Sequence, residues 1–210
     1  MTKRAGGKFG REEDDFYPTP ELAVRPLLPH LYTKTRFYEP CAGDGSLSRI
    51  LVNCGHVCMG MSDIRPKAPE VEKLNALRLE KTPPIDRIIT NPPWKRDLMH
   101  MLMENLPLLA PAWFLIESDW LFTKQAHPLW RKISKIVAIG RVRWIPGSAS
   151  DGFDNCCWVL MRDQETETVF YGRQASTLDS AKNKNFENAQ NRNLENKGAG
   201  SAARASSPKT

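Results

Sequence analysis

The sequence contains no run of 18 apolar residues, which argues against a membrane-spanning helix. It also contains few cysteines: five in 210 residues, without a Cys-x-x-Cys pair. An odd number of scattered cysteines does not predict a disulfide framework. The first residues carry charge but no apolar segment, so we expect no secretory signal and a cytoplasmic protein.

Three residues that often bind metals, Cys54, His56 and Cys58, lie close together in the sequence. Their spacing differs from the ligand spacing typical of structural zinc sites. We interpret them as soft residues of a small apolar strand. We therefore expect no metal in the functional site.

The net charge of +6 is concentrated at the two ends of the chain. Residues 1–11 contain four bases and no acid, and residues 173–210 contain seven bases and three acids. Each end therefore carries +4, which leaves −2 for the residues between them. Basic arms bind phosphate groups without sequence preference. Tails that only keep a protein in solution have the same composition, and both interpretations remain open.

Composition divides the chain into three expected parts. Residues 1–14 form a basic flexible arm, residues 15–172 one domain, and residues 173–210 a low-complexity basic tail. The tail is rich in Asn, Ala, Ser, Lys and Gly, and Phe186 is its only aromatic residue. Such a segment buries too little apolar surface to offset its ordering entropy, so we expect it to be mostly disordered.

Between the two ends, predicted strands alternate with predicted helices. Short apolar strands in this arrangement favour an α/β fold with a doubly wound, mostly parallel sheet. Ligands of such sheets bind at the carboxyl ends of the strands. The predicted strands are 36–39, 57–62, 85–90, 112–117, 135–145 and 155–162, the last two as an antiparallel pair. The predicted helices are 21–31 with Thr19 as N-cap, 47–53, 97–106 and, interrupted by Pro128, 124–133.

The segment Glu39–Leu47 follows a predicted strand and opens a predicted helix. Gly43 and Gly45 allow the backbone to approach a ligand closely, and the helix start offers unpaired N–H groups. The segment is not the dinucleotide-binding fingerprint, because a third glycine is missing at the required spacing. An ordinary turn would explain two glycines alone, but not the whole segment.

Asp63 lies at the end of the next predicted strand, about twenty residues further on. An acidic residue in this position can accept hydrogen bonds from the hydroxyl groups of a ribose. A surface aspartate that caps the following loop is the alternative. Because Asp63 follows the glycine segment at this distance, we favour ribose binding.

The segment Asn91-Pro92-Pro93-Trp94 follows the predicted strand 85–90. Two prolines fix the backbone, and they hold the Asn91 side-chain oxygen and the Pro92 carbonyl as two acceptors in one plane. An exocyclic amino group has two hydrogens to donate to such a pair. Trp94 offers a flat face on which a flipped base could stack.

These segments, together with Asp15–Pro20, resemble the amino-methylating class I S-adenosylmethionine-dependent methyltransferases, especially the small phage-type DNA N6-adenine methyltransferases. The resemblance covers about residues 15 to 162. It implies a seven-stranded Rossmann-like methyltransferase fold with a C-terminal antiparallel hairpin, S-adenosylmethionine as cofactor, and DNA, or else RNA, as partner. The implied cofactor-binding residues are Tyr17, Thr19, Pro20, Glu39, Ala42, Gly43, Asp44, Gly45 and Asp63, and the implied catalytic residues are Asn91, Pro92, Pro93 and Trp94.

The sequence departs from that family in three respects. Trp94 stands where Tyr or Phe is more frequent, and the acidic residue expected near the adenine ring is replaced by Asn75 at best. We also find no target-recognition domain, and therefore expect a relaxed or very short recognition site. Candidates for specificity are Lys95-Arg96, Ser118–Trp120 and the loop 147–153, while Lys135, Arg141 and Arg143 either track phosphates or form a solvated strand face.

Two alternatives to DNA methylation remain. The same loop chemistry serves RNA bases and the glutamine amide of proteins, because each presents a planar amino group. A methyltransferase fold retained as a non-catalytic binding module is the second alternative, although the motif residues are intact. The oligomeric state stays open.

Overall fold

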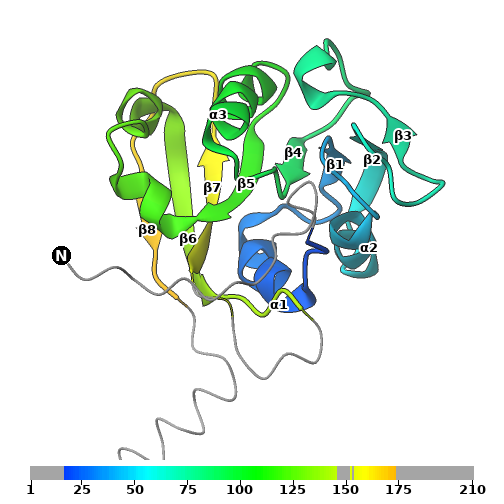
Figure 1. The fold of residues 1–210 in the computed structure, drawn as a ribbon, viewed down its shortest axis with the longest axis horizontal. Helices are drawn as coiled ribbons and strands as arrows, with labels where there is room; N and C mark the ends of the chain where they lie inside the picture. The colour runs from blue at the N-terminus through cyan, green and yellow to red at the C-terminus, as the bar shows by residue number, and fades with distance from the viewer. Residues whose placement is uncertain (1–16, 146–151, 153, 174–210) are drawn as a thin grey trace, which may run out of the picture. The chain divides into compact units, whose positions relative to one another are not determined.

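One eight-stranded sheet forms the centre of the described structure, in the order β3-β2-β1-β4-β5-β7-β6-β8 (Figure 1). All neighbouring strands are parallel except β7, which is antiparallel to both β5 and β6. The strands are β1 (Arg36–Glu39), β2 (Val57–Asp63), β3 (Glu72–Lys73), β4 (Arg87–Thr90), β5 (Ala112–Glu117), β6 (Ile133–Arg141), β7 (Asn155–Met161) and β8 (Val169–Tyr171).

This computed structural model describes residues 17–145, 152 and 154–173. The expected arm 1–14, the tail beyond Arg173 and all of the loop 147–153 except Gly152 lie outside the described residues. The boundaries expected at 14 and 173 therefore stay predictions.

The strand order reverses at β1, which pairs with β2 on one side and with β4 on the other. After β1 the chain continues to β2 on one side, whereas after β4 it continues to β5 on the other side. Such a switch point opens a crevice beyond the carboxyl ends of the strands, where doubly wound folds bind ligands. The segments 40–45 and 91–95 both begin at this edge.

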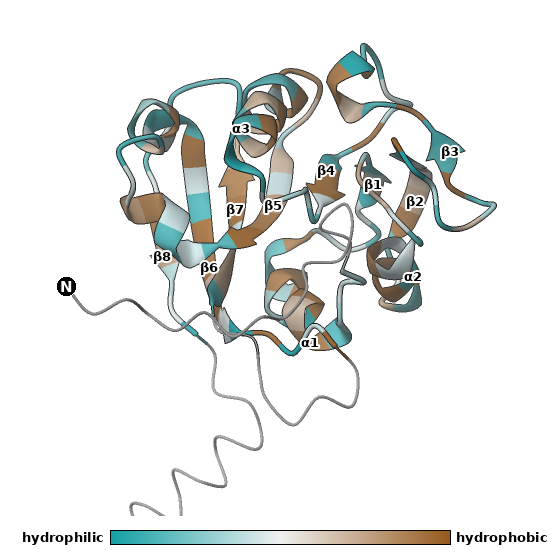
Figure 2. Ribbon diagram, viewed as in Figure 1, coloured by the Kyte–Doolittle hydropathy of each residue, from teal (hydrophilic) through white to brown (hydrophobic). Residues whose placement is uncertain are grey.

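Helical segments cover both faces of the sheet. On one face, Leu47 and Leu51 pack with Phe37 and Trp113. On the other face, Leu102 packs in a cluster with strand residues of β4 and β5. Figure 2 shows apolar residues gathered on the central strands β4 and β7. The first face carries α1 (Glu21–Val24), η1 (Arg25–His30) and α2 (Ser46–Asn53), and the second carries η2 (Ala76–Arg78), α3 (Arg96–Asn105), η3 (Leu106–Leu108), η4 (Ser118–Phe122) and η5 (His127–Lys132).

The prediction of one helix over 21–31 was wrong in its length. The α-helix ends at Val24 and continues as the 3₁₀ segment η1. Pro26 and Pro29 lack the N–H that an α-helix needs in its interior, so the chain tightens after its first turn. The N-cap residue is Pro20 rather than Thr19, and no side chain caps this helix.

The expected seven-stranded sheet has eight strands. The sequence prediction missed β3 and β8, which are two and three residues long and lie at the two edges of the sheet. The strand expected at 135–145 spans Ile133–Arg141, and the strand expected at 85–90 begins only at Arg87. The antiparallel pairing of β6 with β7 confirms the expected hairpin.

Among the described residues, no helix has the length and apolar character needed to cross a membrane.

Candidate functional site

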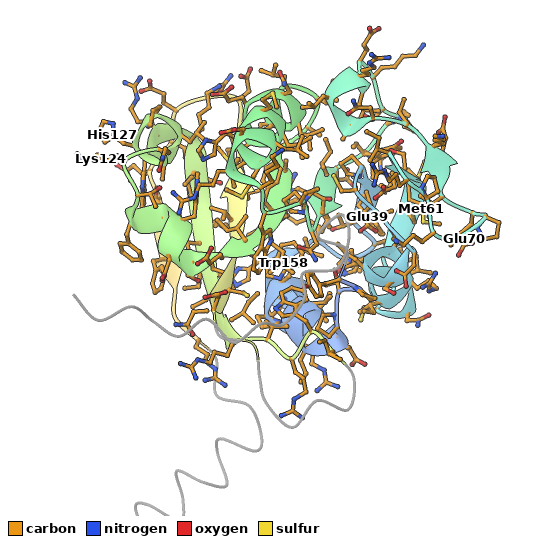
Figure 3. All side chains as sticks on the ribbon, in the orientation of Figure 1. Glu39, Met61, Glu70, Lys124, His127 and Trp158 are labelled. Carbon is orange, nitrogen blue, oxygen red and sulfur yellow. The ribbon has the colours of Figure 1, made fainter. Side chains whose placement is uncertain are left out.

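The connection from β1 to α2 is built around two glycines in the left-handed region. Gly43 has φ +56° and Gly45 has φ +78°, a conformation that is unfavourable for residues with a Cβ. A Cβ on Gly45 would lie 3.1 Å from Arg49 Nη1 and 3.3 Å from Met61 Sδ. Figure 3 shows Met61 beside Glu39, its register partner on the neighbouring strand. Local conformation therefore favours glycine at both positions, and a Cβ on Gly45 would also require the ends of the Arg49 and Met61 side chains to shift slightly.

Asp63 connects this loop to the end of β2. Its Oδ2 accepts a hydrogen bond from the Gly43 N–H at 2.8 Å, and its Oδ1 accepts one from the Arg65 N–H at 2.8 Å. Asp63 thus caps the loop that follows it, as the alternative reading expected, and also holds the glycine loop. Each carboxylate oxygen has a second lone pair, so acceptor capacity for ribose hydroxyls remains.

Asp44 is engaged at the start of α2. Its carboxylate accepts hydrogen bonds from the N–H of Ser46 at 2.9 Å and from the Ser46 hydroxyl at 2.8 Å. Arg49 lies 3.6 Å from the same carboxylate. These contacts order the first turn of α2, and the expected role of Asp44 toward a cofactor stays a prediction.

Glu39 is the most buried acidic side chain near the site, with 1% exposed surface. The Ser48 hydroxyl donates a hydrogen bond to Glu39 Oε2 at 2.5 Å. Burial raises the pKa of Glu39 to about 8; the Ser48 hydrogen bonds lower it and the charges of Asp44 and Asp63 raise it. Glu39 is thus largely uncharged at neutral pH, and it fastens α2 to β1. Its expected contact with a cofactor remains a prediction.

Asn91 follows β4, and its side chain reaches the segment before α1. Its Nδ2 donates a hydrogen bond to the hydroxyl oxygen of Thr19 at 3.2 Å. Thr19 is buried and Asn91 half-buried. Two motifs that lie 72 residues apart in the sequence therefore meet side by side. Pro92 is buried and Pro93 half-buried, so the loop packs against the protein.

Trp94 belongs to an aromatic cluster with Trp144 and Tyr17. The Trp94 indole N–H donates to the Leu115 carbonyl at 3.1 Å, which fixes the ring. Trp144 meets Trp94 edge to face, with ring centroids 5.5 Å apart, and lies 6.3 Å from Tyr17. All three side chains are half-buried, so they keep accessible surface.

The sequence prediction missed Trp144. Its position was expected within a strand over 135–145, whereas it follows the end of β6. An aromatic residue next to a Gly/Ser-rich loop was the available signal, but it does not reveal a contact with Trp94, fifty residues earlier.

Other residues with expected roles have different surroundings. The Asn75 side chain accepts a hydrogen bond from the Leu77 N–H at 3.0 Å and caps η2. Trp120 is buried and donates to His100 Nε2 at 2.7 Å, so it offers no free edge for base recognition. Lys95 and Arg96 are exposed, and Arg96 donates to the Gln125 side chain at 3.1 Å.

The candidates for phosphate contacts divide between the two readings. Arg141 is exposed at the end of β6, whereas the Lys135 ammonium lies 5.7 Å above the Tyr171 ring. Within residues 17–145, 152 and 154–173, no group of three His, Cys, Asp or Glu residues could hold a metal ion. The Cys58 thiol faces Ser48 instead, with a sulfur–oxygen distance of 3.7 Å.

A hollow of about 370 Å³ lies at η5, lined by His127, Pro128, Trp130 and Arg131. Figure 3 shows His127 and Lys124 on the opposite side of the view from Glu39 and Met61. None of the sequence motifs contributes to it, so we place the candidate site at the switch point instead.

The chain matches no protein-family model and no curated protein. Among solved structures, a chain from a study of complex assembly in the type I R-M system has a TM-score of 0.52 and 13% identity, covering 73% of this chain and 44% of that chain. A putative hemolysin from Lactococcus lactis has a TM-score of 0.51 and 10% identity, covering 73% and 91%.

A dimethyladenosine transferase from Plasmodium falciparum has a TM-score of 0.47 and 12% identity, covering 70% of this chain and 64% of that one. This chain spans less than half of the R-M chain and less than two thirds of the transferase. At such low identities the likeness concerns the fold alone. The chain therefore shares the α/β fold of the R-M chain and the hemolysin.

Proposed function

We propose that this protein is an S-adenosylmethionine-dependent methyltransferase that methylates the N6 amino group of adenine in DNA. One observation carries the proposal. The Asn91–Trp94 loop and the glycine loop held by Asp63 leave the carboxyl ends of two neighbouring parallel strands, at the switch point of the sheet.

The residues around the glycine loop fit the cofactor. Gly43 and Gly45 add no side chain to this loop and adopt a conformation that side chains disfavour, and the Asp63 carboxylate keeps acceptor capacity for a ribose. By the family resemblance, Tyr17 and Pro20 would hold the methionine end. When bound, the cofactor supplies a methyl group on a sulfonium, which is a strong electrophile.

The Asn91 loop would orient the amino group that is methylated. Because its nitrogen donates a hydrogen bond to Thr19, the Asn91 carboxamide presents its oxygen as one acceptor. The Pro92 carbonyl would supply the second acceptor. Two accepted hydrogen bonds fix the amino group and aim its lone pair. They strengthen as positive charge develops on the nitrogen, so they stabilise the transition state more than the ground state. The surplus proton leaves to solvent afterwards.

The aromatic cluster would hold the flipped base. Trp94 and Trp144 keep accessible surface next to the Asn91 loop, and aromatic faces bind extruded bases by stacking. This supports a nucleobase over a protein glutamine, whose amide offers no ring. The basic ends of the chain, with +4 each, also favour a nucleic acid, but they suit RNA as well as DNA.

The described residues contain no separate recognition domain, and we therefore propose relaxed or very short sequence specificity. We place the protein in the cytoplasm of a bacterial or phage-infected cell.

The test is the transfer of labelled methyl from S-adenosylmethionine to unmethylated duplex DNA, single-stranded RNA and total protein, with Asn91→Ala beside the unchanged chain. We expect label in DNA, recovered as N6-methyladenine. The variant should lose at least about a hundred-fold in kcat while it still binds the cofactor. Label in RNA or protein would show that the acceptor is RNA or protein instead of DNA. Cofactor binding without any transfer would favour the binding module, and an Asn91→Ala variant with unchanged rate would refute the catalytic assignment.

A further inference from the structure

The hydrogen bond between Asn91 and Thr19 has a direction, and that direction matters for a planar carboxamide. The Asn91 nitrogen donates, and the Thr19 hydroxyl oxygen accepts at 3.2 Å. A carboxamide has one donor end and one acceptor end, so holding the nitrogen leaves the oxygen as the available end. A side chain rotated by half a turn would instead present N–H groups to an incoming amine, which also needs to donate.

We propose that Thr19 is a positioning residue that anchors the Asn91 carboxamide through its nitrogen and so leaves its oxygen available. This inference rests on the proposed function, since it concerns the same amino group. It differs from the role implied by resemblance, in which Thr19 contacts the cofactor.

The surroundings of Thr19 hold its hydroxyl in place. Thr19 is 6% exposed and immediately precedes Pro20, the N-cap of α1. The carbonyl of Ala23 in α1 accepts a hydrogen bond from the Trp158 indole N–H at 2.7 Å. Trp158 lies fully buried in β7, and Figure 3 shows it next to α1. The segment with Thr19 is therefore fastened to the sheet, and Asn91 directly follows β4 of the same sheet.

Only some side chains can replace the threonine. Serine keeps a hydroxyl oxygen on the same Cβ, whereas valine has nearly the same shape and no acceptor. In Thr19→Val the carboxamide loses the anchor at its nitrogen, and the half-buried Asn91 side chain loses a hydrogen-bond partner. We expect kcat to fall roughly ten-fold or more, because one lost hydrogen bond of this kind corresponds to about that factor.

The kinetic experiment compares Thr19→Val, Thr19→Ser and Thr35→Val. Thr35 is an equally buried threonine whose hydroxyl donates to the Tyr32 carbonyl at 2.7 Å, before β1, and it serves as the matched control. We expect Thr19→Val to lower kcat without changing the Kd for S-adenosylmethionine measured by calorimetry. Thr19→Ser should restore kcat, and Thr35→Val should keep it. Adding Thr19→Val to Asn91→Ala should cause no further loss.

Three kinetic results would overturn the proposal. They are an unchanged kcat in Thr19→Val, a weakened cofactor affinity that explains the whole loss, and a serine variant as slow as the valine variant.

A second measurement does not depend on activity. The side-chain amide of Asn91 can be assigned in ¹⁵N NMR spectra as the signal that Asn91→Ala removes. We expect its protons to exchange faster in Thr19→Val than in the unchanged chain, and at nearly the original rate in Thr19→Ser. If the amide protons are protected but no acceptor is methylated, the proposed function is refuted while the hydrogen bond between Asn91 and Thr19 is supported. If exchange is unchanged in Thr19→Val, the positioning role of Thr19 is refuted.

Discussion

The carboxylate of Asp63 accepts a hydrogen bond from the backbone N–H of Gly43 at 2.8 Å. This contact joins the end of β2 to the loop after β1, and the second carboxylate oxygen holds the following loop through the Arg65 N–H. One side chain therefore shapes two loops at the switch point. A change at Asp63 should disturb the proposed cofactor site as a whole.

Asp63→Asn should weaken the binding of S-adenosylmethionine by about ten-fold or more. An amide is uncharged and has only one acceptor oxygen, so both backbone N–H groups lose a charged partner and one of them loses its acceptor as well; hydrogen bonds to charged groups contribute about 1.5–3 kcal/mol. Calorimetric titration measures the Kd. Asp86→Asn is the control, because Asp86 pairs with Arg36 at 2.9 Å, at the amino-terminal end of β1. Equal affinity in the Asp63 variant and the unchanged chain would contradict this prediction.

Gly45→Ala and Gly55→Ala should lower stability by similar amounts but differ in cofactor binding. Both glycines have positive φ, at +78° and +90°, where a Cβ costs about 1–2 kcal/mol. A Cβ at Gly55 has no neighbour within 4 Å, whereas one at Gly45 meets Arg49 and Met61. Urea unfolding should show both losses. Only Gly45→Ala should raise the Kd for the cofactor, and an unaffected Kd would argue against a cradle in this loop.

Glu39→Gln should change how stability depends on pH. Burial raises the pKa of Glu39 from 4.5 to about 8 in the folded protein. Between these values the folded chain binds a proton that the unfolded chain has released, so this group makes stability fall as the pH rises. The slope is at most about 1.4 kcal/mol per pH unit. Glutamine does not titrate, and it can still accept from Ser48.

Urea unfolding at pH 5 and pH 8 measures the effect. We expect the unchanged chain to lose more stability than Glu39→Gln over this interval, since all other titrating groups are common to both proteins. Parallel losses in the two proteins would show that Glu39 does not titrate in this window.

Trp144→Ala should weaken the binding of an adenine-containing oligonucleotide by about ten-fold, since stacking of one base contributes roughly 1–3 kcal/mol. Tyr32→Ala is the control, because Tyr32 is 67% exposed and lies before β1, away from the Asn91 loop. Fluorescence anisotropy gives the affinities, and thermal unfolding shows whether the aromatic cluster survives. If both variants bind as the unchanged chain does, Trp144 does not hold the base.

Local interactions explain why much of the site could be predicted. The strand 36–39, the strand 112–117 and the turn with Gly43 and Gly45 depend on residues close in sequence: a short apolar run, and backbone angles that only glycine adopts at low cost. The order of strands and motifs along the chain then placed both loops at one edge of the sheet.

The failures have different physical causes. The helix predicted over 21–31 is divided into α1 and η1. The prediction gave more weight to the apolar pattern than to the prolines. In the structure, Pro26 and Pro29 lack the N–H groups that a continuous α-helix needs. The edge strands β3 and β8 are short and carry polar or exposed residues, so only pairing with β2 and β6 makes them strands.

The sequence by itself determined the α/β class, the two loops and the residue types they carry, because backbone sterics and apolar periodicity act over a few residues. Only the tertiary structure decided that Thr19 holds Asn91, that Trp144 meets Trp94 and that Asp63 holds Gly43. Each of these contacts joins residues twenty or more positions apart. They form only when the packed sheet fixes both partners, which no local pattern in the chain encodes.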